Sequence, residues 1–303
     1  YKLVERVSDQ KRALYAMAVY LFNPFTLVYG SFLWLNPTPY VFFTILAFYL
    51  AYIDRTHESV ATLALATLYK QFAVVFFPIL AFFLIKSKEM SIKKGLIAFI
   101  TYTMIYAGII GLVSLPFLLV DMNGYLQSVI TGNLGWIENL RTFIPENWMP
   151  IHLGTFWLWI GAPTWFTNTV AFLLANYIFV ILCALFVYGS YLTAKPQDRH
   201  GTLGSRRERL FSRALVWCFI AVLCVQMFYP RGSYKFYLLI LAPFMAILFD
   251  YQDLDLDATI PFEFKPRRAF PMVMSVIVFL CHRWVYFWIL GFWGIFMLLK
   301  GGF

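Results

Sequence analysis

Long apolar runs separated by short polar connections form the main pattern along the chain. The runs lie at Ala13–Leu35, Tyr40–Ile53, Ala61–Leu68, Phe72–Ile85, Gly95–Val120, Asn168–Thr193, Ala214–Tyr229, Phe236–Phe249 and Pro271–Leu299. They have the length of helices and lack the alternation of apolar and polar positions that marks the strands of a membrane barrel. The pattern predicts an all-α polytopic membrane protein with roughly 8–10 transmembrane or re-entrant helices in one domain, residues 1–303.

The two runs that meet at Tyr69-Lys70-Gln71 allow two interpretations. A single helix through both would span a bilayer with Lys70 deep in hydrocarbon, whereas a hairpin would place Lys70 at its tip. The arms of the hairpin reach about 12 and 21 Å at ~1.5 Å per residue, short of the ~30 Å hydrocarbon core. With the hairpin, 19 of the 24 lysine and arginine residues fall on one side, which the positive-inside rule makes cytoplasmic. The sequence therefore favours the hairpin.

Composition supports a membrane location. The 303 residues are 61% hydrophobic, 20% aromatic and 13% charged, with a mean hydropathy of +0.72, which is more apolar than a soluble domain needs. The net charge of +9 would suggest nucleic acid as the partner of a soluble protein, but here the basic residues lie between spans, so no nucleic-acid partner is expected. We expect a multi-pass protein of the endoplasmic reticulum in a eukaryote, or of the plasma membrane in a prokaryote. The cysteines inside apolar runs predict reduced packing residues: Cys183, Cys218, Cys224 and Cys281.

Five cations remain on the non-cytoplasmic side, where positive charge is disfavoured. They are Lys70, Arg141, Arg231, Lys235 and Arg283. All but Arg141 lie at short polar tips between apolar runs, so converging tips would form a basic pocket for a lipid-linked phosphate. The alternative is that these side chains extend to lipid headgroups without a specific role. Lys70 is the strongest functional candidate because its hairpin arms are too short to reach the interface.

The stretch Asp121–Thr167 is the longest one that does not span. It contains the outer carboxylates Asp121, Glu138 and Glu146, which are the candidate catalytic acids, together with Arg141 and His152. Glu138 and Arg141 are also spaced to pair on a helix, and His152 also fits a structural role. Its tryptophans can stack on sugar rings, although anchoring in the membrane interface is the favoured interpretation.

Alternating carboxylates at Asp253, Asp255 and Asp257 lie in a polar loop on the cytoplasmic side. They lack the glycine and terminal glutamate of a calcium-binding loop, so we expect a solvated acidic segment and no metal. No cofactor is expected elsewhere in the chain.

Three segments resemble a known family. LFNPFTLVYGSFLWLNPTPYVFFTILAFYLAYIDR, ATLYKQFAVVFFPIL and the stretch from SYKFY to Ala242-Pro243 are similar to parts of GT-C glycosyltransferases, in particular the mannosyltransferase that starts GPI-anchor assembly and its archaeal and bacterial relatives. The features that carry the resemblance are Asn23-Pro24 at the end of a span, an outer turn around Gly30, and Lys70 ahead of Pro78. The resemblance covers Ala13–Ile85 and Met227–Phe249.

The resemblance implies a GT-C-like fold that transfers a sugar, mannose in this group, from a polyprenyl-phosphate donor on the non-cytoplasmic face. Together with the charge pattern it gives these substrate-binding candidates: Lys70, Arg231, Tyr234, Lys235, Arg141, His152 and Arg283. Transfer with inversion needs a carboxylate base, which in the family lies in a first outer loop, and a second acid often follows the glycine of the turn. This sequence departs at both places, since that loop is absent and GSFLWLNPTP contains no carboxylate.

Three functions remain open. The first is a GT-C glycosyltransferase, with the basic start Tyr1–Arg12 read as the middle of a longer chain or with another membrane subunit supplying the missing loop. The second is a non-catalytic GT-C-like membrane subunit that packs in a larger complex. The third is a transporter or scramblase, disfavoured by the few ionisable residues inside the spans. The expected partners are the sugar-lipid donor, membrane lipids and such a subunit.

Overall fold

The computed structural model describes residues 1–33, 37–127, 206–228, 235–251 and 266–281, with short pieces at 157, 160–167, 169–170, 173, 184, 288–289 and 292. This part of the chain is mostly helical and contains no strand, which confirms the all-α prediction for it. The α-helices are α1 (Lys2–Val7), α2 (Gln10–Leu21), α3 (Pro37–Tyr52), α4 (Thr56–Tyr69), α5 (Phe76–Ser87), α6 (Ile92–Leu126), α9 (Arg206–Phe228), α10 (Leu241–Tyr251) and α11 (Pro266–Leu280). Three tighter or wider helical segments interrupt them: the π-helix η1 (Thr26–Phe32) and the 3₁₀-helices η2 (Gln71–Val75) and η5 (Lys235–Ile240).

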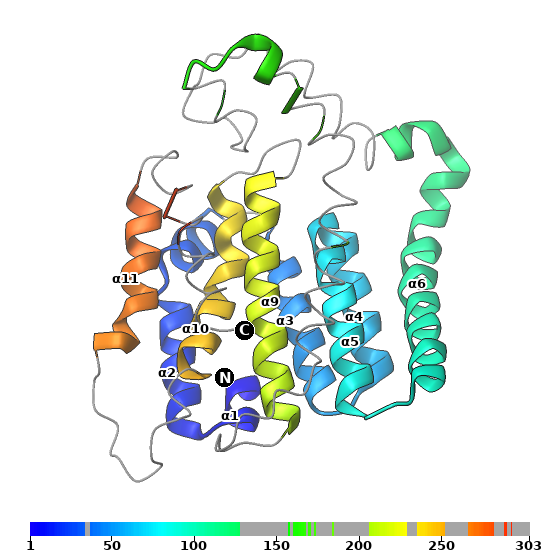
Figure 1. Cartoon of the computed structure of the whole chain (residues 1–303), viewed down its shortest axis with the longest axis horizontal. Helices are drawn as coiled ribbons and strands as arrows, with labels where there is room; N and C mark the ends of the chain where they lie inside the picture. Colours follow the sequence, from blue (N-terminus) through cyan, green and yellow to red (C-terminus); the bar gives the residue numbers. More distant parts are fainter. Residues whose placement is uncertain are drawn as a thin grey trace.

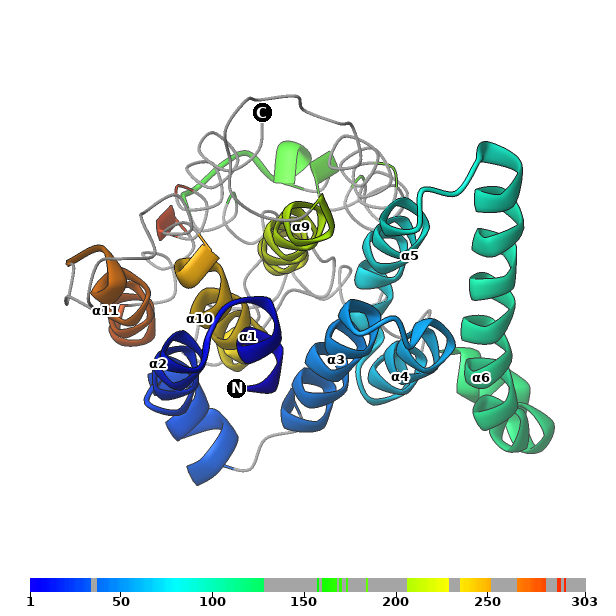
Figure 2. The same ribbon diagram turned by 90° about the horizontal axis from the view of Figure 1, so that it is seen from below.

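The longer helices lie side by side, and successive ones run in opposite directions from α2 to α6 and again from α9 to α11 (Figure 1). The pair α3 and α4 turns at Asp54, whose φ of 66° lies in the left-handed region that aspartate tolerates better than most residues. The short helix α1 lies across one end of the bundle (Figure 2) and buries Leu3, Val4 and Val7 there. This arrangement brings chain segments far apart in the sequence to the same end of the bundle.

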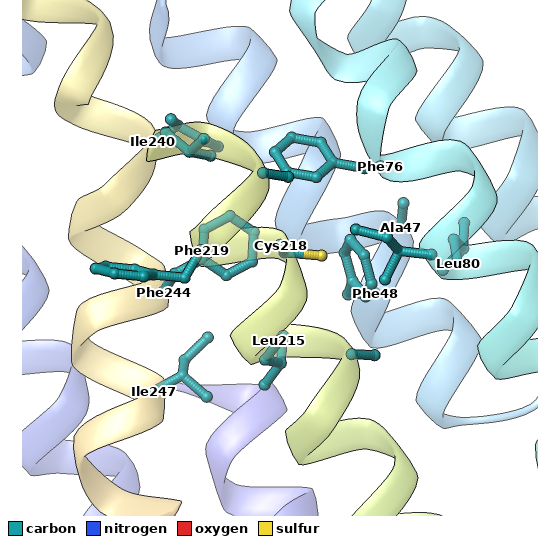
Figure 3. Packing of buried hydrophobic residues seen from close by; sticks show 14 of the residues in the cluster. Ala47, Phe48, Phe76, Leu80, Leu215, Cys218, Phe219, Ile240, Phe244 and Ile247 are labelled. Atoms are coloured by element: carbon teal, nitrogen blue, oxygen red, sulfur yellow. The ribbon is translucent and has the colours of Figure 1, made fainter. Parts of the chain in front are cut away.

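A cluster of phenylalanines forms the centre of the core (Figure 3). Phe48 of α3, Phe76 of α5 and Phe244 of α10 are fully buried, with ring centroids 5.8–6.4 Å apart. Cys218 of α9 lies among them as a free, buried thiol. Cys224 and Cys281 also form no disulfide, so the prediction of reduced cysteines is confirmed for these three, while Cys183 lies outside the described residues.

One described helix, α6, is both long and apolar enough to cross a membrane. It has 35 residues, and a second crossing is obtained if α2 and η1, which are bent by 69°, count as one broken span. Other apolar helices in the described ranges have 10–17 residues. The prediction of 8–10 membrane helices therefore stays a prediction.

The hairpin around Lys70 is confirmed. Helix α4 ends at Tyr69, Lys70 is extended (φ −149°, ψ 114°), and α5 returns toward the start of α4. Near the end of α5, Lys88 Nζ donates a hydrogen bond to Thr56 Oγ1 at 2.7 Å, so the two arms begin and end together. The alternative of one continuous helix through Lys70 is wrong. The 14 residues of α4 give this arm a length of about 21 Å.

Candidate functional site

The two ends of the bundle differ in charge. One end of the bundle, which we call the cationic end, contains α1, the start of α2, the α3–α4 turn, the α5–α6 turn, and the first described residues of α9 and α11 (Figure 1). The elements that meet there carry Lys2, Arg6, Lys11, Arg12, Arg55, Lys86, Lys88, Lys93, Lys94, Arg206, Arg207, Arg209, Arg213, Arg267 and Arg268. Within the described ranges, the opposite end carries only the cations Lys70 and Lys235. The structure therefore places the described cations as the hairpin topology requires.

At the opposite end of the bundle, the chain breaks between α2 and η1, at Asn23-Pro24. Asn23 is fully buried, and its Oδ1 accepts a hydrogen bond from the amide of Phe25 at 3.0 Å, so it caps the segment that follows. Pro24 suits the first position of that segment because it has no amide hydrogen to leave unpaired. The Nδ2 of Asn23 donates to Ser275 Oγ of α11 at 2.8 Å, and Ser275 Oγ in turn donates to Met245 Sδ of α10 at 3.1 Å. One asparagine thus shapes the break and ties it to two distant helices.

The π-helix η1 continues from this break toward η5. A π-helix is rare, and single turns of it often mark functional sites. Gly30 of η1 faces its neighbours at ordinary contact distance, since a Cβ atom there would lie 3.7 Å from Thr38 Oγ1 and 3.8 Å from the Leu239 methyl groups. The outer turn around Gly30 that the resemblance singled out is therefore packed against η5, the segment that begins with Lys235.

Lys70 occupies the tip of the hairpin at the same end of the bundle. Its amide donates to Ala66 O at 2.9 Å, and its carbonyl accepts from the amide of Ala73 at 3.0 Å, so the backbone is held on both sides. The neighbouring Tyr69 ring stacks on Phe43 of α3 with centroids 5.5 Å apart. The Lys70 side chain is half-buried. Figure 1 shows α6 extending past the end of α4, so this tip does not reach as far as α6 does.

The other predicted substrate-binding residues are described incompletely. Lys235 opens η5, which packs on η1, α3 and α9, but only its backbone is described. Outside the described residues lie Arg141, His152, Arg231, Tyr234 and Arg283, and with them Glu138, Glu146 and the Asp253–Asp257 segment. The structure thus brings Lys70 and Lys235 to one end of the bundle, and their convergence with the other cations stays a prediction.

Asp121, the described candidate for the catalytic acid, has a structural role in this conformation. It lies at a kink in α6 (φ −152°, ψ 87°), and its Oδ1 accepts a hydrogen bond from the amide of Gly124 at 2.9 Å. Past the kink the chain turns back on α6, with Tyr125 bonded to Ser114 at 2.7 Å and stacked on Phe117. The exposed Asp121 carboxylate caps this turn, and it is the one described acid at the opposite end.

A polar cluster at the cationic end was not singled out from the sequence. Arg207 Nη1 donates to Asp54 Oδ2 at 2.7 Å, and its Nη2 donates to Ala51 O at 3.0 Å. Lys88 Nζ lies 3.8 Å from the other Asp54 oxygen. The hydrogen bond from Arg207 lowers the pKa of Asp54 below its usual value, and the charges of Arg207 and Lys88 act in the same direction. The cluster joins α9 and α5 to the α3–α4 turn. In the sequence, Asp54 stands out only as an aspartate between two apolar runs.

Among the described residues of the opposite end, Lys70 is the cation whose side chain is described. Within the described ranges, no group of three or more histidine, cysteine, aspartate or glutamate residues lies close enough to hold a metal ion. The half-buried side chain of Lys70, at the break between α4 and η2, can neutralise an anion and position it by hydrogen bonds. No known protein family, characterised protein or solved structure matches this chain.

Proposed function

We propose that the chain is a multi-pass integral membrane protein whose cationic end faces the cytoplasm. The grouping of lysines and arginines at one end of antiparallel helices follows the positive-inside rule. A bilayer also accounts for α6, where Leu112, Leu119 and Val120 are 72–88% exposed. In water each exposed Å² of such surface costs about 25 cal/mol, whereas acyl chains cover it without that cost.

Within this membrane frame, we propose that the protein is a GT-C-type glycosyltransferase, or the part of one that binds the donor. The substrate is a sugar, mannose in the resembling group, linked to a polyprenyl phosphate at the non-cytoplasmic face. The observation that carries the proposal is the position of Lys70 on an arm of about 21 Å, short of the ~30 Å hydrocarbon core. A lysine at that depth can bind an anion, and a lipid-linked phosphate is an anion that reaches this depth.

In this reaction, Lys70 would bind the group that leaves. An acceptor hydroxyl attacks the anomeric carbon, the bond from that carbon to the phosphate oxygen breaks, and the phosphate leaves with the electron pair. Lys70 would bind the phosphate and stabilise the negative charge that grows on it as it leaves. A base must take the proton of the acceptor hydroxyl, and within the described ranges only Asp121 lies at this end as a carboxylate.

The second candidate function is a non-catalytic GT-C-like subunit. The observation that favours it is the role of Asp121, whose carboxylate caps the kink in α6. Such a subunit would bind the lipid phosphate and leave chemistry to a partner chain that carries the base.

The test is transfer of labelled mannose from a polyprenyl-phosphate donor by the full chain in liposomes. Lys70→Ala is expected to lower the rate by about 10- to 100-fold, since a hydrogen bond to a charged group contributes about 1.5–3 kcal/mol. Lys70→Arg is expected to lose less because it keeps the charge. Lys94→Ala, which removes an exposed lysine at the cationic end, is the matched control and should transfer at the wild-type rate.

Two results would contradict the proposal. Equal rates for Lys70→Ala and the wild-type chain would remove Lys70 from the site. Donor binding that depends on Lys70, without any transfer, would favour the non-catalytic subunit over the enzyme.

A further inference from the structure

The turn that precedes Lys70 is fastened to α6 by one hydrogen bond. The Thr67 hydroxyl lies three residues before Lys70 and makes a short hydrogen bond with the hydroxyl of Tyr106. Thr67 Oγ1 also lies 3.1 Å from the carbonyl oxygen of Leu63 within α4. Tyr106 is 6% exposed, so its hydroxyl is removed from solvent and a lost partner would be costly.

The same tyrosine also contacts the other arm of the hairpin. Its ring stacks on Phe77 of α5 with centroids 4.5 Å apart and planes inclined by 30°. Thr67 precedes Lys70 and Phe77 follows it, so Tyr106 contacts the chain on both sides of the tip. Aromatic stacking adds about 0.5–1.5 kcal/mol beyond burial of the rings.

Few residues of α6 are buried, and Tyr106 is one of them. The buried residues of this 35-residue helix are Gly95, Tyr102, Tyr106 and Ser114. These positions follow helical spacing and form one stripe. Among them, Tyr106 carries a hydroxyl that is bonded to α4 close to the hairpin tip.

We propose that Tyr106 is a positioning residue for Lys70. By holding the hairpin tip, Tyr106 determines where the Lys70 ammonium group meets the phosphate of the lipid donor. The inference rests on the proposed function and deepens it, because it adds α6 to the elements that build the phosphate site. Tyr106 acts through Thr67 and Phe77. The stacking of Tyr69 on Phe43 restrains the tip from the α3 side.

A double-mutant cycle tests this dependence. The probe is decaprenyl phosphate, titrated against the full chain in phosphatidylcholine nanodiscs. Tyr106→Phe removes the hydroxyl and keeps the ring, and we expect it to weaken binding by about 2- to 12-fold, the range for one hydrogen bond. In the Lys70→Ala background the same substitution should cause no further loss. Tyr102→Phe, at a buried tyrosine one turn earlier on α6, is the control and should bind as the wild type does.

A second readout is independent of the lipid. A Lys70→Cys chain is alkylated with a small maleimide, and Tyr106→Phe should change the alkylation rate by about 2-fold or more, because the tip loses one hydrogen bond. Tyr102→Phe should leave the rate unchanged.

The outcomes distinguish the positioning role of Tyr106 from the proposed function of Lys70. The positioning role is overturned if Lys70→Ala weakens probe binding and Tyr106→Phe does not, or if Tyr106→Phe costs the same factor in both backgrounds. If Lys70→Ala binds the probe as tightly as the wild type, the proposed function fails instead. In that case unchanged alkylation rates would overturn the positioning role as well.

Discussion

Asn23→Ala is expected to destabilise the protein more than any other single hydrogen-bond deletion at the opposite end. The substitution removes the acceptor of the buried Phe25 amide and the donor to Ser275 Oγ. Losing one ordinary hydrogen bond costs about 1 kcal/mol, and leaving a buried amide without a partner costs about 1–3 kcal/mol. The expected loss in the free energy of unfolding is therefore about 2–4 kcal/mol.

Ser275→Ala separates the two contributions. It removes the hydrogen bonds with Asn23 and Met245 but leaves the cap on Phe25 intact, so the expected loss is about 1–2 kcal/mol, smaller than that for Asn23→Ala. Because Asn23 and Ser275 share one bond, the double substitution should cost less than the sum of the single ones.

The assay is unfolding of the full chain in mild detergent, followed by helical circular dichroism. A loss for Asn23→Ala that equals the loss for Ser275→Ala would refute the reasoning, because the cap on Phe25 would then contribute nothing.

Three further outcomes follow from the contacts. Arg207→Ala should lower the free energy of unfolding by about 1 kcal/mol, a modest loss because Asp54 is 53% exposed and solvent screens the pair; thermal unfolding measures it. Since Arg207 lowers the pKa of Asp54, the stabilisation from this pair is present at neutral pH and lost as the pH falls below the ordinary aspartate value of about 4, and unfolding of Arg207→Ala across that range should depend less on pH. Gly30→Ala should be tolerated because its Cβ meets Leu239 at 3.8 Å, whereas Gly30→Leu should cost about 1–3 kcal/mol by overpacking against η5, and equal melting temperatures for the two would contradict this.

Local chemistry explains what the sequence predicted well. The resemblance places the end of a span at Asn23-Pro24, and α2 ends there because the asparagine side chain caps the next segment and proline has no amide hydrogen, both properties of two adjacent residues. The hairpin tip at Lys70 followed from the charge count, because the positive-inside rule acts on whole loops and needs no knowledge of packing. The run Gly95–Val120 lies within α6, since an uninterrupted apolar run leaves no other way to pair its backbone.

Long-range partners could not be predicted in the same way. Asp54 and Arg207 are separated by 153 positions, and nothing in either segment identifies the other. The same holds for Asn23 and Ser275, which are 252 positions apart. The described part of α9 also includes Arg206, eight positions before the predicted span at Ala214, because arginine and leucine favour helix even where the segment is polar. Apolar run boundaries mark the hydrophobic part of a helix and not its ends.

The most direct test of the account is the side of the membrane on which each end of the bundle lies. In a full-length chain whose native cysteines are replaced by alanine, single cysteines at Glu58 and Lys88 report the cationic end, and cysteines at Ser31 and Met122 report the opposite end. All four positions are exposed, so a membrane-impermeant maleimide can label them in sealed vesicles of known orientation. The account predicts that positions 58 and 88 are labelled only from the cytoplasmic side, and positions 31 and 122 only from the other side. Labelling of all four positions from one side would contradict it.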